Sequence, residues 1–330
     1  MEKTRDRSGS GKSFFTLRDH GGGIDAAAAR WGGNRCDWLD LSTGINPVAY
    51  PLPDLPPDCW SALPDMAATR ELADAARRFW KVPPHMQVLA VPGASAAIAR
   101  IPALPPPGRV HIHAPTYNEH AAAFRTAGWA VSNRPQGADA TVLVHPNNPD
   151  GRLWCSGDLP GDGLLVIDES FCDVAPESSL LDAVADRPDT VVLKSFGKFW
   201  GLAGLRLGFA LGPPDLLDRL AGMFGPWAVS GPALAIGTAA LNDGIWADRT
   251  RARLVRDAAR LDTLLSATGA CPVGGTSLFR LHDVGDATAM QARLATAHIW
   301  TRRFPYSDRW LRVGLPGREA DWRRLADALA

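Results

Sequence analysis

The sequence has few cysteines, and they form no recognisable pattern. Five cysteines are scattered along 330 residues, and none lies in a Cys-x-x-Cys pair, which argues against a disulfide framework and a structural zinc site. The chain also lacks net charge, because Lys plus Arg and Asp plus Glu are 35 each. Such a balance provides no overall field that would attract nucleic acid or an anionic membrane. We therefore expect no metal, no nucleic-acid partner and no membrane partner.

Long apolar runs are also absent, so nothing in the chain predicts a membrane-spanning helix. The N-terminus has no apolar core of the kind found in secretion signals, and we expect a cytoplasmic protein. What the chain does have is 46% hydrophobic and 21% charged residues, which is enough for a large core. We predict a disordered lead-in over 1–13, an N-terminal segment over 14–45 beside a small domain, a large domain over 46–231 and the small domain over 232–330.

Short apolar runs recur from about residue 85, and each ends at Gly, Pro, Asn or Asp. Several are continuous rather than alternating, which is typical of strands buried on both faces. Helix-compatible segments lie between them, so the pattern predicts an α/β sheet with helices on both sides. The seven candidate strands are Gln87–Val91, Arg109–His113, Trp129–Val131, Ala140–His145, Leu164–Asp168, Val191–Lys194 and Leu205–Leu211. After Pro232 the chain turns helical and then adds two strand-like pieces, which predicts a smaller α+β domain.

Lys198 has the most informative surroundings in the chain. It lies in a glycine-punctuated turn between two apolar runs, with Ser195 three residues before it and Arg206 eight residues after it. A lysine among apolar and small residues is desolvated, which favours its neutral form and suits it to forming a Schiff base with an aldehyde. A hydroxyl and a guanidinium suit phosphate oxygens, so the segment indicates pyridoxal phosphate. A solvated lysine in a strand-to-strand turn is the alternative for this segment alone. Gly11-Lys12-Ser13 imitates the end of a phosphate-binding P-loop, but Asp6 stands where that motif has glycine.

The ends of four candidate strands carry further chemistry, and ligands of open α/β sheets bind at such ends. Ala94 and Ser95 begin a helix with amides suited to an anion, and Tyr117 provides a ring that can stack on a pyridine. Asn148 is held extended by the following proline and can donate to a phenolate oxygen. Asp168 ends an apolar strand and needs a cationic partner such as a pyridinium nitrogen. Taken singly, these residues could be a helix cap, a core tyrosine, a turn asparagine and an N-cap aspartate.

Together these motifs resemble the fold-type I pyridoxal phosphate enzymes of the aminotransferase class I and II group, across nearly the whole chain after residue 20. The resemblance implies a mixed, mostly parallel seven-stranded sheet and a homodimer. It gives Lys198 and Asp168 the catalytic roles and adds Arg312, in Trp310-Leu311-Arg312-Val313-Gly314, as the residue that binds the substrate carboxylate. The cofactor-binding residues it implies are Ala94, Ser95, Tyr117, Asn148, Asp168, Ser195, Lys198 and Arg206.

Within that group the chain resembles the threonine-phosphate decarboxylases of cobalamin biosynthesis more than the histidinol-phosphate aminotransferases. The segments that carry this resemblance are His20–Ile24, Leu39–Pro47, Asp168–Phe171, Gly225–Pro232 and Arg302–Pro305. It implies a small phosphorylated amino-acid substrate, with His20, Arg302, Arg303 and Asn46 joining Arg312 in binding it. Many aminotransferases have Tyr at the places of Phe171 and Leu63, which argues against simple transamination. Transamination of histidinol phosphate and a catalytically silent cofactor-binding partner in corrinoid assembly remain the alternatives.

Overall fold

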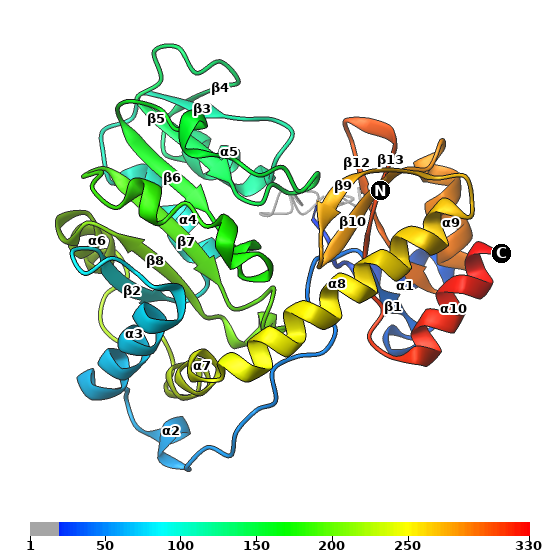
Figure 1. Cartoon of the computed structure of the whole chain (residues 1–330), viewed down its shortest axis with the longest axis horizontal. Helices are drawn as coiled ribbons and strands as arrows, with labels where there is room; N and C mark the ends of the chain where they lie inside the picture. Colours follow the sequence, from blue (N-terminus) through cyan, green and yellow to red (C-terminus); the bar gives the residue numbers. More distant parts are fainter. Residues whose placement is uncertain (1–19) are drawn as a thin grey trace, which may run out of the picture.

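The computed structural model describes residues 20–330, and they form two bodies joined by one long helix (Figure 1). The predicted lead-in 1–13 and Gly11-Lys12-Ser13 lie outside the described residues. Within residues 20–330, no helix is both long enough and apolar enough to cross a membrane.

The larger body is built on a seven-stranded sheet with the strand order β2-β8-β7-β6-β5-β3-β4. Strand β8 is antiparallel to both of its neighbours, and the remaining neighbours pair in parallel. This confirms the predicted α/β fold with a mixed, mostly parallel sheet. The strands are β2 (Gln87–Val91), β3 (Arg109–Ile112), β4 (Ala130–Ser132), β5 (Ala140–Val144), β6 (Leu164–Asp168), β7 (Thr190–Ser195) and β8 (Gly208–Gly212).

Helices cover both faces of this sheet because its central strands are apolar on both sides. Every residue of β5, β6 and β8 is buried, and successive side chains of β6 alternate between two separate core clusters. Leu165 and Ile167 pack with α3 (Met66–Trp80) and α7 (Gly231–Asn242), whereas Val166 packs with α4 (Ala94–Arg100), α5 (Asn118–Thr126) and α6 (Pro214–Gly222). The continuous apolar runs in the sequence therefore correspond to a sheet enclosed between two helical layers.

The smaller body contains a four-stranded antiparallel sheet with the order β12-β13-β10-β9. Its strands are β9 (Cys271–Thr276), β10 (Phe279–Asp283), β12 (Arg302–Phe304) and β13 (Ser307–Gly314), and its later helices are α9 (Ala287–Thr296) and α10 (Glu319–Leu329). The N-terminal part, with α1 (Ile24–Trp31), lies beside it, because β1 (Leu39–Asp40) pairs in parallel with β11 (Ile299–Trp300). The sequence pattern did not predict β9 and β12, since one is rich in glycine and the other carries two adjacent arginines.

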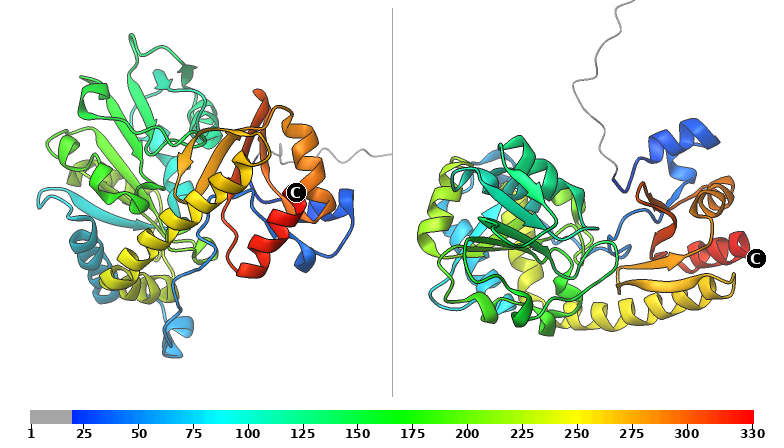
Figure 2. Two further views of the ribbon diagram at one scale, coloured as in Figure 1. Left: turned by 45° about the vertical axis from the view of Figure 1, so that its right-hand side comes forward. Right: turned by 90° about the horizontal axis from the view of Figure 1, so that it is seen from above.

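Helix α8 (Gly244–Ser266) runs from the large body to the small one, as both views in Figure 2 show. Helix α7, which precedes it, packs on α3 in the large body. The change from one body to the other lies along α8, and the predicted start of the small domain at residue 232 stays a prediction. The other predicted boundaries stay predictions.

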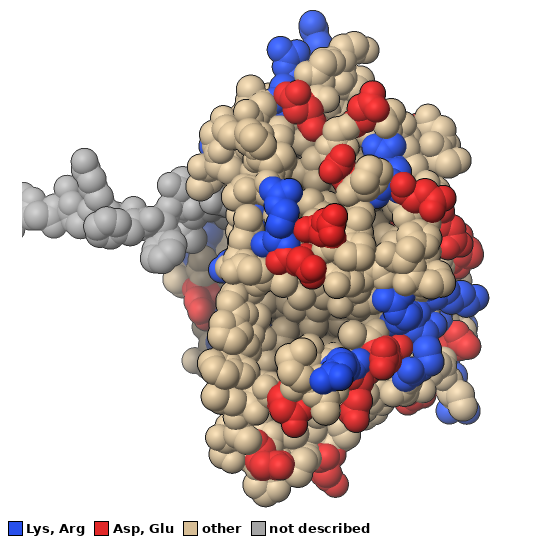
Figure 3. Space-filling view, turned by 90° about the vertical axis from the view of Figure 1, so that its left-hand side faces the viewer, with Lys and Arg blue, Asp and Glu red and all other residues tan. Residues whose placement is uncertain are grey.

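Two further features of the large body bear on its surface. The short helix α2 (Asp58–Ser61) projects below the body in Figure 1 and carries Trp60, which is 72% exposed. On the face drawn in Figure 3, acidic and basic side chains are interspersed. That mixture agrees with the balanced composition of the chain.

Candidate active site

Two adjoining cavities bring the predicted site residues together. The inner cavity, of about 110 Å³, is lined by all eight predicted cofactor-binding residues: Ala94, Ser95, Tyr117, Asn148, Asp168, Ser195, Lys198 and Arg206. The outer cavity, of about 280 Å³, is lined by His20, Arg302 and Arg312 among others. Tyr117, Asn148, Phe171 and Lys198 line both cavities. Lys198 therefore lies at the junction, where one amine can reach groups bound on either side.

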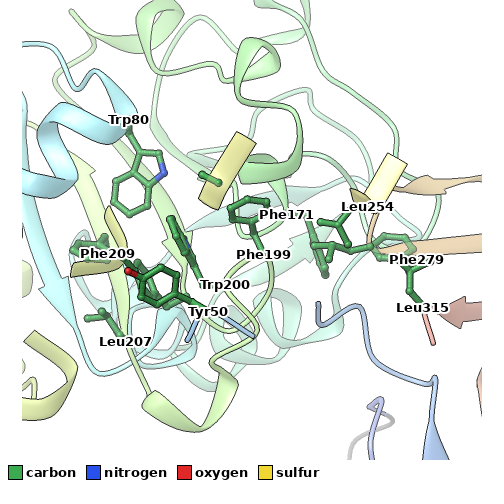
Figure 4. Close-up of a cluster of buried hydrophobic side chains, with 14 of the residues drawn as sticks. Tyr50, Trp80, Phe171, Phe199, Trp200, Leu207, Phe209, Leu254, Phe279 and Leu315 are labelled. Atoms are coloured by element: carbon green, nitrogen blue, oxygen red, sulfur yellow. The ribbon is translucent and has the colours of Figure 1, made fainter. Parts of the chain in front are cut away.

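The turn that carries Lys198 is anchored by buried aromatic side chains. Phe196, Phe199 and Trp200 have no solvent exposure, and the Trp200 ring is stacked between Phe196 and Trp246 of α8. Figure 4 shows Trp200 beside Tyr50, with Phe199 in the same cluster. Aromatic anchors on both sides of a lysine restrict its backbone, so the amine stays directed at the cavities.

Burial makes the Lys198 amine easier to deprotonate. Desolvation, and next the positive charge of Arg312, lower the pKa of Lys198 to about 8, although Asp168 acts in the opposite direction. An amine with that pKa is partly neutral near physiological pH and can act as a nucleophile. This agrees with the reactivity that the sequence predicts for the turn.

Asp168 is kept ionised at the end of β6. Burial by itself would raise the pKa of Asp168, but hydrogen bonds from His120 and Ser170 outweigh it, and the pKa is lowered. His120 Nε2 lies 2.8 Å from Asp168 Oδ2, and because an ionised carboxylate can only accept, the imidazole donates. The Ser170 amide donates to Oδ1 at 3.0 Å. A buried, ionised carboxylate of this kind suits a protonated pyridine nitrogen.

Sequence reasoning did not assign a role to His120, which is 1% exposed. The position of His120 was a usable signal, because Tyr117 is the residue directly before α5 and His120 lies about one turn further along. Residues at that spacing share a face, so a helix that directs Tyr117 into a site also directs His120 toward it.

An anion cup lies at the far end of the inner cavity. Gly93 precedes α4 with a φ of +84°, and a Cβ at this position would lie 2.7 Å from Arg206 Nη2. The absence of a side chain at Gly93 thus allows the guanidinium to lie over the backbone amides at the start of α4. Arg206 itself has a left-handed backbone and donates to Ala203 O at 2.9 Å. Arg206, the Ser95 and Ser195 hydroxyls and these amides form a donor set that suits phosphate.

Asn148 and Arg312 are joined across the two bodies. Arg312 Nη1 donates to Asn148 Oδ1, and Arg312 Nη2 donates to Ser42 O at 2.7 Å. Because the Asn148 oxygen is occupied, its amide nitrogen is the group that remains for a ligand. That orientation suits donation to a phenolate oxygen, as the sequence predicts.

The outer cavity collects positive charge. Arg302 and Arg312 both line it, and burial, followed by the charge of Arg302, lowers the pKa of Arg312 to about 10. Arg312 Nε is buried without a hydrogen-bond partner among the described residues. His20 lines the same cavity and lies 2.9 Å from Glu119. An anionic ligand would provide acceptors for this set.

Two of the predicted substrate-binding residues do not line either cavity. Arg303 donates to Gln291 Oε1 at 2.7 Å and to Thr288 Oγ1 at 2.5 Å, so its side chain is directed at α9. The Asn46 amide is used within the protein, donating to Phe199 O at 2.8 Å and accepting from Arg253 at 2.5 Å. Both side chains are thus engaged within the chain, and their predicted contact with the substrate stays a prediction. His20, Arg302 and Arg312 remain candidates.

The two departures from the aminotransferase pattern have clear places in the structure. The Phe171 ring lies 5.3 Å below Lys198 Nζ and packs edge-on against Phe279. It supplies an apolar wall where a tyrosine would supply a hydroxyl. Leu63 is 66% exposed, next to Asp65, which caps α3 by accepting from the amides of Ala67 and Ala68. Leu63 thus lies on the surface of the described chain, away from the cavities.

His145, Glu169 and Cys172 form a buried group whose spacing could suit a metal ion. The ring nitrogens of His145 are both occupied, because Nδ1 accepts from Trp154 N at 3.0 Å and Nε2 donates to Ser178 O at 2.6 Å. Burial also raises the pKa of the Cys172 thiol, which disfavours the thiolate that a metal needs. We therefore assign this group to the core.

The donor set of the inner cavity fits pyridoxal phosphate. Lys198 offers an amine of lowered pKa for the aldehyde, and Asp168 offers an ionised carboxylate for the ring nitrogen. Tyr117 offers a ring face, Asn148 an amide donor, and Arg206 with its neighbours the phosphate cup. Each functional group of this cofactor thus has a chemically suitable partner within one cavity.

Comparisons with known proteins agree with this fold and this cofactor. The family model described as aminotransferase class I and II matches residues 58–329. A threonine-phosphate decarboxylase from Sinorhizobium sp is 43% identical over 94% of this chain and 97% of its own, and one from Pseudomonas aeruginosa is 40% identical over 95% and 97%. The crystal structure of a histidinol-phosphate aminotransferase from Sinorhizobium meliloti with pyridoxal-5'-phosphate superimposes with a TM-score of 0.78 at 21% identity, covering 97% of each chain.

Proposed function

The chain belongs to the aminotransferase class I and II family, and on that premise we propose that it is a pyridoxal phosphate enzyme that decarboxylates L-threonine O-3-phosphate. The product is (R)-1-amino-2-propanol O-2-phosphate, which we assign to cobalamin biosynthesis. The similarity to two threonine-phosphate decarboxylases over nearly the full length of each chain supports this activity. At 21% identity, the histidinol-phosphate aminotransferase supports the fold alone.

The observation that carries the proposal is the pair of guanidinium groups in the outer cavity. Burial, and next the charge of Arg302, lower the pKa of Arg312, and the hydrogen bonds of Arg312 to Asn148 and Ser42 go to neutral oxygens. Two neighbouring cations are stabilised when the ligand brings two anionic groups. Threonine O-phosphate has a carboxylate and a phosphate on one short chain, and we assign the carboxylate to Arg312 and the phosphate to Arg302 and His20.

When bound, pyridoxal phosphate supplies an electron sink for the carbanion that remains after carbon dioxide leaves. Asp168, kept ionised by His120 and Ser170, holds a proton on the pyridine nitrogen and so keeps that sink effective. The Asn148 amide nitrogen would donate to the phenolic oxygen of the cofactor, because its own oxygen accepts from Arg312. Phe171 has no hydroxyl and would add no second hydrogen bond to that oxygen. Lys198 exchanges its proton readily near pH 8 and returns a proton to the substrate Cα.

Bond choice in this reaction depends on orientation. Arg312 and Arg302 bind the two anionic ends of the substrate and so set the rotation about the Cα bonds. That rotation would select which of the Cα bonds breaks when the cofactor is bound. The apolar Phe171 wall, packed against Phe279, lies beside the junction where Lys198 is located.

We also propose that the chain acts as a homodimer. Leu52, Trp60, Leu63 and Met66 are between 65% and 72% exposed and come from one stretch of the large body around α2. Several exposed apolar side chains within one short stretch are a feature expected of a protein interface. A second copy of the chain would cover them, and sedimentation analysis of the purified protein tests this.

Product analysis tests the activity. The holoenzyme incubated with L-threonine O-phosphate should release carbon dioxide and form aminopropanol phosphate, and Lys198→Ala should form neither. Formation of glutamate from histidinol phosphate and 2-oxoglutarate, without carbon dioxide release from threonine O-phosphate, would refute decarboxylation in favour of transamination.

A matched pair of variants tests the phosphate site. Arg302→Met should raise the KM for threonine O-phosphate by roughly 10- to 100-fold, because a hydrogen bond to a charged group contributes about 1.5–3 kcal/mol. Arg303→Met removes the same charge from the neighbouring residue, whose side chain is directed at α9. It should leave KM nearly unchanged. Equal effects of the two variants would contradict the assignment of Arg302.

A further inference from the structure

Three consecutive carbonyl groups of the lysine turn accept hydrogen bonds from one short segment, residues 46–50. Asn46 N donates to Lys198 O at 3.0 Å, and Tyr50 N donates to Trp200 O at 2.9 Å. Between them, Asn46 Nδ2 donates to Phe199 O at 2.8 Å. The segment therefore holds the backbone on which Lys198 is mounted.

The contact between this segment and the turn is too close for a side chain on the turn. Gly201 has a φ of +70°, and a Cβ there would lie 2.7 Å from Ala49 Cα and 2.8 Å from Asn46 O. The same segment begins beside the outer cavity, which Thr43 and Gly44 line. It thus connects the substrate side of the site with the lysine turn.

Arg253 determines which way the Asn46 amide is directed. Asn46 is 2% exposed, and its Oδ1 accepts from Arg253 Nη2 at 2.5 Å and from Val48 N at 3.1 Å. With the oxygen held in this way, the amide nitrogen is directed at Phe199 O. Arg253 is itself held by Asp257, one turn further along α8, at 2.9 Å. Helix α8 is the helix that joins the two bodies (Figure 1).

We propose that Asn46 and Arg253 are positioning residues for Lys198. The pair links α8 to the carbonyl of Phe199, directly after the lysine, and so sets where the Lys198 amine lies at the junction of the two cavities. This positioning role is additional to the proposed function. Only the measurement of turnover rests on that function. Since neither side chain is part of the lining of either cavity within residues 20–330, the pair should affect the chemical step more than substrate binding.

The experiment compares Arg253→Met with Arg256→Met in the holoenzyme. Arg256 is exposed on the same helix, so its replacement removes the same charge without touching Asn46. Arg253→Met should lower kcat for threonine O-phosphate about tenfold with KM nearly unchanged, which is less than the ~100-fold that a 1 Å misplacement can cost. Arg256→Met should change kcat less than twofold. Arg253→Lys retains a donor for Asn46 and should recover part of the loss.

A second readout does not depend on decarboxylation. The visible circular dichroism of the cofactor bound at Lys198 reports its orientation, and Arg253→Met should alter its amplitude whereas Arg256→Met should not. Asn46→Ala should produce the same spectral change, and adding Arg253→Met to it should change nothing further, because the two residues act as a unit. The proposal is overturned if Arg253→Met and Asn46→Ala keep the wild-type spectrum. It is also overturned if their spectral changes add independently.

Discussion

Replacing Lys194 by methionine should destabilise the protein strongly, although Lys194 is outside both cavities. Its Nζ lies 2.5 Å from Glu169 Oε2, and the two side chains are 2% and 0% exposed. Glu169 also accepts from Ser179 Oγ at 2.8 Å and from Leu180 N at 2.7 Å, so its carboxylate is fully engaged in the core. Desolvation by itself would lower the pKa of Lys194, but the negative charge of Glu169 outweighs it and raises the pKa, which keeps the Lys194 ammonium group charged.

The size of the loss follows from what Lys194→Met leaves behind. Removing one partner of a buried ion pair leaves a buried charge without compensation, which typically costs about 3–5 kcal/mol. For a denaturant slope of about 3 kcal/mol per M, this corresponds to a urea midpoint roughly 1 M or more below that of the wild type. Glu169→Gln should cost a similar amount, because it leaves the ammonium group buried.

A double-mutant cycle on the apoenzyme separates the ion pair from general damage to the core. Combining Lys194→Met with Glu169→Gln removes both charges, so the double variant should be more stable than either single variant. Arg309→Met, which breaks an exposed pair with Asp283 at 2.8 Å, serves as the surface control and should barely move the midpoint. Wild-type stability in Lys194→Met, or simple additivity in the double variant, would refute the reasoning.

Other predictions concern the cavities and the lysine turn. The rate at which Lys198 of the apoenzyme captures added pyridoxal phosphate should rise with pH through a midpoint near 8 and level off above it. The reason is that the pKa of Lys198 is lowered to about 8 and the neutral amine is the nucleophile. A rate that still climbs through pH 10 would contradict this. Arg312→Met should move that midpoint upward, since the Arg312 charge helps to lower the pKa of Lys198. Asp168→Asn should bind the cofactor yet lose about 100-fold or more in kcat for carbon dioxide release, as losses of preorganised electrostatic groups do; near-normal turnover would remove Asp168 from the mechanism. Gly201→Ala should lower the thermal midpoint, because its Cβ would lie 2.7 Å from Ala49 Cα, and an unchanged midpoint would show that residues 46–50 are not packed as described.

Much of the inner cavity could be predicted from sequence because local chemistry and sheet geometry agree. The continuous apolar runs indicate buried parallel strands, and parallel strands bring their carboxyl ends to one edge. Asp168 ends one such strand and Lys198 follows another, and Tyr117 and Asn148 follow two others. Residues placed at this edge come together independently of the details of side-chain packing, and all four line one cavity. The strands β9 and β12 escaped prediction because glycine and charge obscured their periodicity.

The sequence by itself determined which chemistry this chain can perform, whereas the tertiary structure decided which polar side chains reach the site. Arg302 and Arg303 are adjacent in β12, and because successive side chains point to opposite faces of a strand, one lines the outer cavity and the other binds α9. Asn46 meets Arg253 across 207 residues of chain, a contact that no local pattern encodes. His120 likewise reaches Asp168 only when α5 packs on the sheet. Such partners are fixed by the relative placement of whole elements, which depends on the packing of the entire core.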